Sequence, residues 1–517
     1  MKTEQLAREE PPVNIGDPWP EPDEARAWLL DVQQKLYRWA RDEPQRRFSD
    51  LANLVYDRHS LVAAWHRVAS RKGAHTAGVD GATRGSVERR GVERFLTDIR
   101  DDLWSRTFQA LEVREKLIPK RDEGTRRLGV PALRDRVVGE ALRGVIEPVF
   151  EAGFRSQSYG FRPGRRAHDA IAEVVHLAQN PIGYDWVIEG DIQACFDEIP
   201  HWLITDGLTA RISDKRVLAW CRSFLKAGVM TESGDREATM IGTPQGGVVS
   251  PLFANIALDG LDRFFDQRQQ ELFGTWDQAH WRRKKGLITY RMVRYADDFV
   301  VMIKGPDAQP QAEILREEIA DHLFEMGLTL HRDKTRITHL SEGIDFLGYT
   351  ISKQHVPGRG DVIYTYPSRR SLERIKDRVR ELTASNTTNL ELAEILYPLN
   401  TALRGWAAYF RFGSSKRTFR YLGHFAWRRV IRWIKRKHPS WGWKDLQRRY
   451  PEWEPRSGDL SLYNPERMPV VRYRYRGQRI AHAWNTHEVD PAGARFRLVN
   501  VDDADEHAWL EEILTMG

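Results

Sequence analysis

Hydrophobic positions along the chain recur at two spacings, one typical of helices and one typical of strands. Spacings of three and four residues occur in ARAWLLDVQQKLYRWA (25–40), LVAAWHRVASRKG (61–73) and RVVGEALRGVIEPVF (136–150), which predicts amphipathic helices there. Short apolar runs of strand length occur in WVIEGDI (186–192) and on both sides of the acidic pair in RYADDFVVM (294–302), and these predict strands. The chain is therefore expected to mix α and β structure.

Turn residues divide the remaining segments. REKLIPKRDEGTRRLGVP (114–131) has an apolar strand, a polar turn around Gly124 and a second short strand, which predicts a β-hairpin. Further helices are expected at 200–225, from about Pro251, at 310–326 and from 368 to about 437, and further strands at 328–340 and 343–351. Irregular structure is expected in a loose leader up to about residue 25, in a basic loop insertion HWRRKKG (280–286), and in a tail of short strands and turns from Glu454.

Composition narrows the class of protein. At 517 residues the chain exceeds one compact core, so about two to four domains are expected. Hydrophobic residues make up 41% and mean hydropathy is −0.58. No apolar run spans a bilayer and no signal peptide opens the sequence, which predicts a soluble cytoplasmic protein without membrane contact. The only cysteines, Cys195 and Cys221, exclude a disulfide framework and a four-cysteine zinc site.

Positive charge is concentrated in one segment. The whole chain has a net charge of only +7, but residues 400–450 contain 14 Lys and Arg against the single acid Asp445, so this segment is +13 and the rest is −6. A dense basic segment of this kind is typical of a surface that binds a polyanion.

The chain contains three carboxylates at the ends of predicted strands. Asp191 ends the apolar strand in VIEGDIQACFDEI, and Asp297 and Asp298 lie between two apolar runs in RYADDFVVM. An acidic pair by itself fits a solvated turn, because Asp is common in turns. If the two strands are neighbours, however, Asp191 and Asp297 meet at one sheet end, where divalent cations would be needed to neutralise them. Two Mg²⁺ ions about 3.5–4 Å apart catalyse phosphoryl transfer from such a site.

The order of these motifs resembles a known family. The Asp191 strand is followed by GTPQGGVVSP, YADD, RDKT and FLGY, in the order found in reverse transcriptases. SYGFRPGRRAHDAI and QGGVVSPLFANIALDGLD more narrowly resemble bacterial group II intron reverse transcriptase/maturases. The resemblance runs from about residue 78 to 450, and several motifs in one order are far more specific than a single match.

The resemblance implies a polymerase site with named residues. Asp191, Asp297 and Asp298 match the catalytic carboxylates, and the implied metal set is Asp191, Ile192, Asp297 and Asp298, which would hold two Mg²⁺ ions with Mn²⁺ as a substitute. Phe196 matches the aromatic residue that excludes a ribose 2′-hydroxyl and so selects dNTPs.

Further residues match the part of the family site that binds the incoming nucleotide: Lys120, Arg126, Gln245 and Gly246. Lys334 in RDKT matches a proton donor to the leaving pyrophosphate, and Arg127 stands where the family usually has Pro. Without the resemblance, each residue also fits an ordinary role, as a core ring, a turn residue or a solvated surface cation.

The basic segment corresponds to the family's thumb, or maturase X domain, which grips template–primer and intron RNA. The expected RNA-binding residues are Arg428, Arg429, Arg432, Lys435 and Arg436. Basic groups at helical spacing can track phosphates, and such binding depends strongly on salt. Each aromatic residue among them fits core packing better than base stacking.

Many family members carry a zinc-dependent HNH nuclease after the thumb. No cysteine follows Cys221, so the resemblance predicts a chain without this nuclease and priming from nascent strands at replication forks. His482 and His487 favour a structural role over a metal site, and VVRYRYRGQR (470–479) could still contact nucleic acid. The tail has no assigned role.

These observations lead to an α+β, right-hand polymerase with fingers, a palm built on an antiparallel sheet, and an α-helical thumb. The expected division is an N-terminal helical extension (1–75), fingers and palm (76–366), the thumb or X domain (367–450) and a small tail domain (451–517). The leading function is an RNA-directed DNA polymerase of a group II intron that also promotes splicing and retrohoming. The expected partners are intron RNA, an RNA template with a DNA primer, dNTPs and target DNA, and the oligomeric state is left open. The alternatives are a non-catalytic RNA-binding maturase, and a related reverse transcriptase in phage defence or diversity generation.

Overall fold

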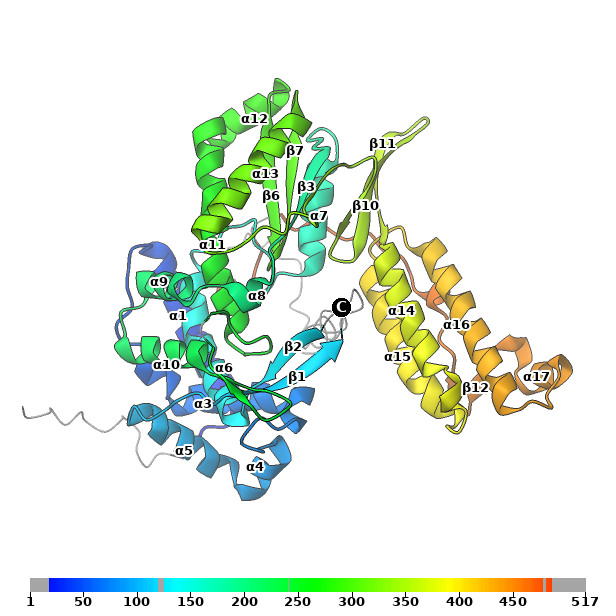
Figure 1. The fold of residues 1–517 in the computed structure, drawn as a ribbon, viewed down its shortest axis with the longest axis horizontal. Helices are drawn as coiled ribbons and strands as arrows, with labels where there is room; N and C mark the ends of the chain where they lie inside the picture. The colour runs from blue at the N-terminus through cyan, green and yellow to red at the C-terminus, as the bar shows by residue number, and fades with distance from the viewer. Residues whose placement is uncertain (1–17, 120–124, 240, 478–479, 486–517) are drawn as a thin grey trace, which may run out of the picture.

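The structure is a computed structural model that describes residues 18–119, 125–239, 241–477 and 480–485. At the N-terminal end, α1, α2 and α3 pack against α6, α5 packs on α3 and α4 packs on α5, and the buried apolar residues of α6 lie in the larger hydrophobic core. Their bounds are α1 (Pro22–Asp42), α2 (Ala52–Val55), α3 (Arg58–Ala69), α4 (Arg84–Arg90), α5 (Val92–Trp104) and α6 (Leu133–Glu151). Figure 1 shows these blue and cyan helices grouped at one end of the molecule.

The predicted hairpin of the fingers is confirmed as β1 (Val113–Pro119) paired antiparallel with β2 (Thr125–Val130). Its turn, with Gly124, lies outside the described residues. The hairpin is extended by β4 (Val229–Met230), which runs parallel to β1, and by β5 (Arg236–Glu237). Helices α8 (Cys195–Glu198), α9 (His201–Arg211) and α10 (Lys215–Lys226) lie between β3 and β4 in the chain.

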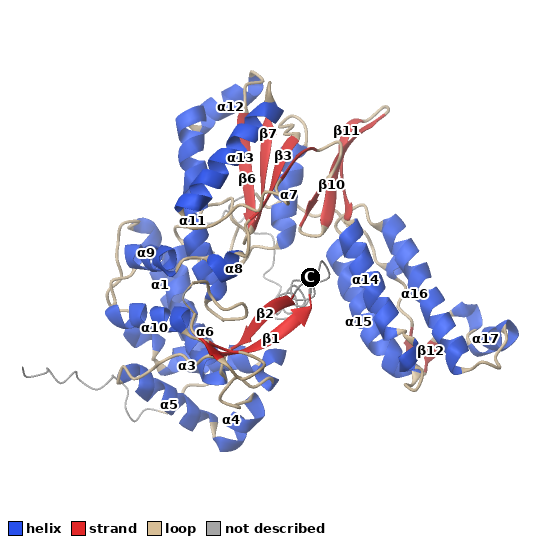
Figure 2. Cartoon of the chain, viewed as in Figure 1, coloured by secondary structure: helices blue, strands red, loops and turns tan. Residues whose placement is uncertain are grey.

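The palm is a four-stranded antiparallel sheet in the order β6-β7-β3-β8. The strands are β3 (Trp186–Asp191), β6 (Thr289–Tyr295), β7 (Asp298–Lys304) and β8 (Arg336–His339). Alternate residues of β7 enter different cores: Val301 packs in one and Val300 in the other. Helices cover both faces of the sheet, and the strand β7 accordingly carries an unbroken apolar run from Phe299 to Ile303. These helices, seen around the red strands in Figure 2, are α7 (Ala167–Ala178), α11 (Ser250–Phe273) and α13 (Ala308–Glu325).

After the palm comes a three-stranded sheet and then a helical region. The sheet has the order β11-β10-β9, with β9 (Ile344–Phe346), β10 (Tyr349–Val356) and β11 (Gly360–Pro367). The helices are α14 (Arg369–Leu382), α15 (Leu392–Phe410), α16 (Lys416–Lys437) and α17 (Trp443–Arg449). In Figure 1 this yellow and orange bundle stands across from the hairpin β1–β2, with the palm sheet above both.

The tail crosses the molecule. Short strands β12 (Arg456–Ser457) and β13 (Leu460–Ser461) pack on α15, where Asn400 Nδ2 donates to the Ser461 carbonyl at 2.7 Å. We call residues 471–477 and 480–485 the strap. It begins at the thumb, where the Val471 N–H donates to the Arg411 carbonyl at 3.0 Å, and it ends on α1, where Trp484 Nε1 donates to Gln33 Oε1 at 3.0 Å.

Two expectations about local structure are wrong. Residues 276–284 form helix α12 (Trp276–Lys284) instead of a loop insertion, because Lys and Arg are good helix formers and Arg282 lies 5.5 Å from the Phe273 ring. Residues 328–340 are not one strand: Thr335 donates its N–H and hydroxyl back to the His331 carbonyl, both at 2.9 Å, which makes a turn before β8. α1 begins at Pro22, close to the expected start near residue 25, and residues 1–17 of the expected leader lie outside the described residues.

Candidate active site

The three aspartates converge at one end of the palm sheet. Asp191 is the last residue of β3 and lies directly opposite Asp298, the first residue of β7. Asp297 is in the two-residue turn that joins β6 to β7. Pairing of β3 with β7 therefore brings together carboxylates that are more than 100 positions apart in sequence.

The carboxylates repel one another. The pKa of Asp298 is raised to about 7 by desolvation and by the negative charges of Asp297 and Asp191. The Asp298 side chain is nevertheless exposed, and the like charges beside it disfavour its ionised form. Lys334 supplies one compensating charge: its Nζ lies 3.1 Å from Asp191 Oδ2, and the turn at His331 positions it there.

The donor set fits a hard divalent cation, because carboxylate oxygens are the ligands that Mg²⁺ prefers. Within the described ranges, no three His, Cys, Asp or Glu side chains are gathered closely enough to hold an ion as they stand. Ile192, the fourth expected metal residue, follows Asp191 with its side chain 2% exposed, so only its backbone could face a ligand.

Phe196 lies near the carboxylates in α8 and is half-buried. Its ring meets Phe161 edge-on, with centroids 6.3 Å apart, and Phe161 in turn lies 6.4 Å from Tyr295. Phe161 adopts a left-handed backbone with φ of +56°. The SYGFRP loop therefore supports the expected sugar-selecting ring, a contact that the sequence did not reveal.

Gln245 and Gly246 join the site to the fingers. Gln245 Nε2 donates to Asp197 Oδ2 at 3.1 Å, and the Gln245 carbonyl accepts from the Gly129 N–H of β2 at 2.7 Å. Gly246 has a φ of +102°, and a Cβ there would lie 2.6 Å from the Gly129 carbonyl oxygen. Glycine is thus required by contact with β2. The sequence analysis did not single out Asp197, although this acid lies only six residues after Asp191, in FDE (196–198).

The two expected finger cations are only partly covered by the structure. Lys120 lies outside the described residues, and Arg126 is placed only by its backbone, which pairs with Ile118 across the hairpin. Arg127, the residue that replaces the usual Pro, forms ion pairs with Glu115 and, at 2.9 Å, with Glu237. It thereby links β2 to β1 and β5.

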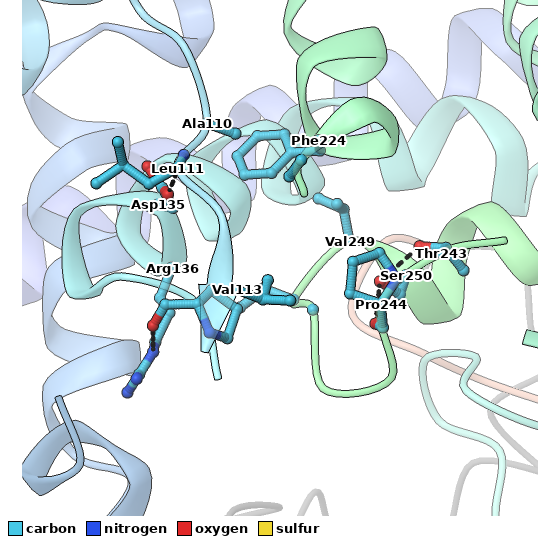
Figure 3. Close-up of a pocket in the computed structure, with 14 residues that line it drawn as sticks. Ala110, Leu111, Val113, Asp135, Arg136, Phe224, Thr243, Pro244, Val249 and Ser250 are labelled. Atoms are coloured by element: carbon cyan, nitrogen blue, oxygen red, sulfur yellow. Dashed lines mark hydrogen bonds between the residues drawn. The ribbon is translucent and has the colours of Figure 1, made fainter. Parts of the chain in front are cut away.

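A small cavity of about 20 Å³ lies behind the QGG loop (Figure 3). It is lined by β1, α6 and the start of α11, and the buried Asp135 carboxylate on its wall accepts from the Leu111 N–H at 2.8 Å. Burial raises the pKa of Asp135 to about 6. The cavity is the size of a single water molecule, so it is a packing feature and does not hold a nucleotide.

The five expected RNA-binding residues of α16 divide into two groups. Arg428 and Arg432 are exposed. Arg429 Nη2 and Arg436 Nη2 donate to the Thr383 carbonyl, just past the end of α14, at 3.2 and 2.6 Å, although Arg436 is itself exposed. Lys435 Nζ lies 4.6 Å from the centroid of the Trp443 ring.

Comparison with known families agrees with this architecture. Residues 118–351 match the description "Reverse transcriptase (RNA-dependent DNA polymerase)", and residues 372–451 match "Group II intron, maturase-specific domain". Protein YkfC of Escherichia coli strain K12 is 37% identical over 377 residues, covering 69% of this chain and 96% of that protein. The chain belongs to the group II intron reverse transcriptase/maturase family. It has an RNA-directed DNA polymerase domain followed by a helical maturase domain, and both imply nucleic-acid binding.

Longer relatives match over part of their length. The "Group II intron-encoded protein LtrA" of Lactococcus lactis subsp. cremoris is 28% identical over 367 residues, covering 62% of this chain and 60% of that protein. A solved telomerase from Candida albicans aligns at a TM-score of 0.36 and 14% identity, over 70% of this chain and 67% of that chain, an overlap too loose to carry an argument. In the described part of the chain, no helix has the length and apolarity needed to cross a membrane.

Proposed function

We propose that this protein extends a DNA primer on an RNA template by two-metal-ion nucleotidyl transfer, and that it binds intron RNA as a maturase to promote splicing and retrohoming. The observation that carries the polymerase proposal is the register of the palm sheet, in which Asp191 is paired with Asp298 and Asp297 lies in the adjoining turn.

Asp191, Asp297 and Asp298 would hold the cations, with the backbone of Ile192 beside them. Two Mg²⁺ ions, or Mn²⁺ in their place, would stabilise the attacking and leaving oxygens of the displacement. The primer 3′-hydroxyl loses its proton to solvent and its oxygen bonds to the α-phosphorus of the dNTP, while the bond from that phosphorus to the oxygen that bridges to the β-phosphorus breaks and releases pyrophosphate. Lys334, with its side chain 64% exposed beside Asp191, donates a proton to the departing pyrophosphate.

The other residues bind and select the nucleotide. Lys120 and Arg126 grip the triphosphate from the hairpin, while Gln245 and Gly246 hold the base and sugar from the loop docked on β2. Phe196 excludes the 2′-hydroxyl by its bulk, because a ring below C2′ leaves no room for the extra oxygen.

RNA binding belongs to the helical region in this proposal. Arg428 and Arg432 offer exposed charge to intron RNA and to the template–primer, and target DNA would enter the same polymerase site as the source of the primer. We also propose the division into an extension (1–75), fingers and palm (76–366), thumb (367–450) and tail (451–517). The basic charge of α16 supports this assignment, since phosphate contacts supply most of the affinity for nucleic acid.

Primer extension tests the proposal. Wild-type protein and Asp297→Ala would be given an RNA template with an annealed DNA primer, Mg²⁺ and dNTPs. Extension by the wild type and not by the variant supports the polymerase and its metal site, and splicing of a flanking intron in the same protein tests the maturase role. A folded wild-type protein that binds RNA but does not extend the primer would leave a non-catalytic maturase as the better description.

A further inference from the structure

Arg294 is the charged residue of β6 nearest the aspartate turn, and it is 0% exposed. A buried guanidinium loses its hydration, so it is tolerated only when its charge and its N–H groups are matched by the protein. Packing in a core strand does not by itself require a buried arginine next to a candidate metal site, so Arg294 is expected to have a further role.

All five N–H donors of the Arg294 guanidinium have acceptors within the palm. Nε and Nη2 donate to the two carboxylate oxygens of Asp262 at 2.9 and 2.5 Å, a fully buried bidentate pair. Nη1 donates to Asn255 Oδ1 at 3.2 Å and to the Ala296 carbonyl at 2.9 Å, and Nη2 also donates to Ser158 Oγ at 2.8 Å.

The contact with Ala296 connects this network to the carboxylates. Ala296 is the turn residue directly before Asp297, and its φ of +56° lies in the left-handed region, a conformation that a residue with a Cβ adopts at a cost. The hydrogen bond from Arg294 fixes the carbonyl oxygen of this strained residue.

Gly160 closes the turn from the other side. A Cβ on Gly160 would overlap the Ala296 backbone nitrogen, so the loop lies directly against the turn. Asn255 Nδ2 donates to the Gly160 carbonyl at 2.9 Å, and thus one asparagine bonds both the loop and Arg294. Asn255 and Asp262 both belong to α11, which begins three residues after the QGG loop.

We propose that Arg294, Asp262 and Asn255 form a positioning clamp that fixes the Ala296–Asp297 turn and couples it rigidly, through α11, to the loop that contacts the nucleotide. Arg294 is a positioning residue because it acts through the turn and touches neither metal nor substrate. The inference rests on the proposed polymerase function, since it assigns a task to the turn that carries Asp297 and Asp298.

The decisive variants are Arg294→Lys, which keeps the charge but cannot reach both α11 and the turn, and Asp262→Asn. Arg291→Lys is the matched control, because Arg291 lies on the same strand and donates to Gln269 of α11 at 3.0 Å without touching the turn. We expect kcat per active site to fall about 100-fold in the clamp variants, the effect of a displacement of roughly 1 Å. The Mg²⁺ concentration for half-maximal rate should rise, while KM for dNTP and template–primer affinity stay near the wild-type values.

Mn²⁺ binding followed by electron paramagnetic resonance separates the clamp from the proposed reaction. Weaker Mn²⁺ binding in Arg294→Lys than in Arg291→Lys, with equal melting temperatures, supports the clamp even if no extension is observed. Equal Mn²⁺ affinity and equal kcat in a folded Arg294→Lys protein would overturn it. If that variant does not fold, Asn255→Leu, which removes only the link to Gly160 and one acceptor, decides the question by the same two measurements.

Discussion

The identity of single side chains at the site is explained by what surrounds them. Phe196 is held by the edge of Phe161 and, through it, by Tyr295, so three motifs distant in sequence set the position of one ring. Gly190, next to Asp191, is required because a Cβ there would overlap the Phe299 ring on the neighbouring strand. The shape of the site therefore depends on residues that perform no chemistry.

Selection against ribonucleotides is predicted to depend on the Phe196 ring. Phe196→Ala removes the bulk below C2′, so the ratio of kcat/KM for dNTP to that for rNTP should fall by about tenfold or more, the scale of discrimination by steric fit. Single-nucleotide incorporation on one template measures both values. Phe196→Tyr keeps the ring and should keep the selectivity. An unchanged ratio in Phe196→Ala would remove the role assigned to Phe196.

At the scale of elements, α16 carries arginines that bond α14 and arginines that are proposed to bind RNA. Its inner face binds the C-terminal end of α14, where Arg429 and Arg436 satisfy the Thr383 carbonyl. Cations are favourable at helix C-termini because the unsatisfied carbonyls there carry partial negative charge. Burial and neighbouring cations lower the pKa of Arg429, as expected for a guanidinium that packs between two helices. Arg428 and Arg432, which are exposed, are the residues proposed to bind a polyanion.

The two groups of arginines are predicted to behave differently when mutated. Changing Arg428 and Arg432 together to Glu should weaken RNA binding and reduce the slope of log K against log salt by roughly 1–2, about one phosphate contact per cation. The melting temperature should stay unchanged. Changing Arg429 and Arg436 together to Gln should instead lower stability by about 2 kcal/mol, since hydrogen bonds from charged groups are lost.

Fluorescence anisotropy at several salt concentrations and thermal denaturation measure these effects. The double glutamine variant serves as the control for the double glutamate variant, because both lose two arginines from the same helix. RNA affinity that falls equally in both variants would show that bonding to Thr383 does not remove Arg429 and Arg436 from RNA binding.

On the scale of the whole molecule, the strap joins three regions. It leaves the thumb at Arg411, crosses α7 where Tyr473 and Arg476 bond Asp169, and ends against α1. Residues of VVRYRYRGQR that were expected to be available to nucleic acid thus partly serve internal contacts. His168 of α7 packs 5.4 Å from the Tyr473 ring, and His482 packs 5.1 Å from the Tyr37 ring.

Acid is predicted to loosen the strap. Burial is the main cause that lowers the pKa of His168 and of His482 to about 4. Near His482, Glu151 opposes this shift and Arg162 and Arg165 add to it. The unfolded chain binds these protons near pH 6.5, so stability is full above that pH and is lost as the pH falls toward 4. Each histidine should cost about 2 kcal/mol at pH 5.

Thermal denaturation between pH 5 and 7.5, with limited proteolysis of the strap, measures this effect. His482→Phe keeps a ring beside Tyr37 and should reduce the loss of stability on acidification by about half, because one of two titrating groups is gone. His66→Gln, which changes an exposed histidine, should leave the pH dependence as it is. A pH dependence that is the same in His482→Phe and the wild type contradicts the assignment.

Much of this protein is determined by its sequence alone. Hydrophobic spacing predicts α6, the hairpin β1–β2 and the strands β3, β6 and β7, because the spacing typical of each element is present within its own consecutive residues. The order of motifs identifies the family, and the three aspartates mark the strand ends that meet. The prediction failed at α12 and at the turn before β8, where the local pattern was ambiguous. The contact of Arg282 with Phe273 favours the helix, and the bond from Thr335 to His331 forms the turn.

Tertiary structure decided which residues share a task. Pairing of β3 with β7 sets Asp191 opposite Asp298, and packing of α16 on α14 gives Arg429 and Arg436 an acceptor that Arg428 and Arg432 do not share. The role of Arg294 depends on Asp262 and Ser158, which come from two other segments of the chain. Such roles arise from contacts between positions far apart in sequence, and a local pattern carries no information about those partners.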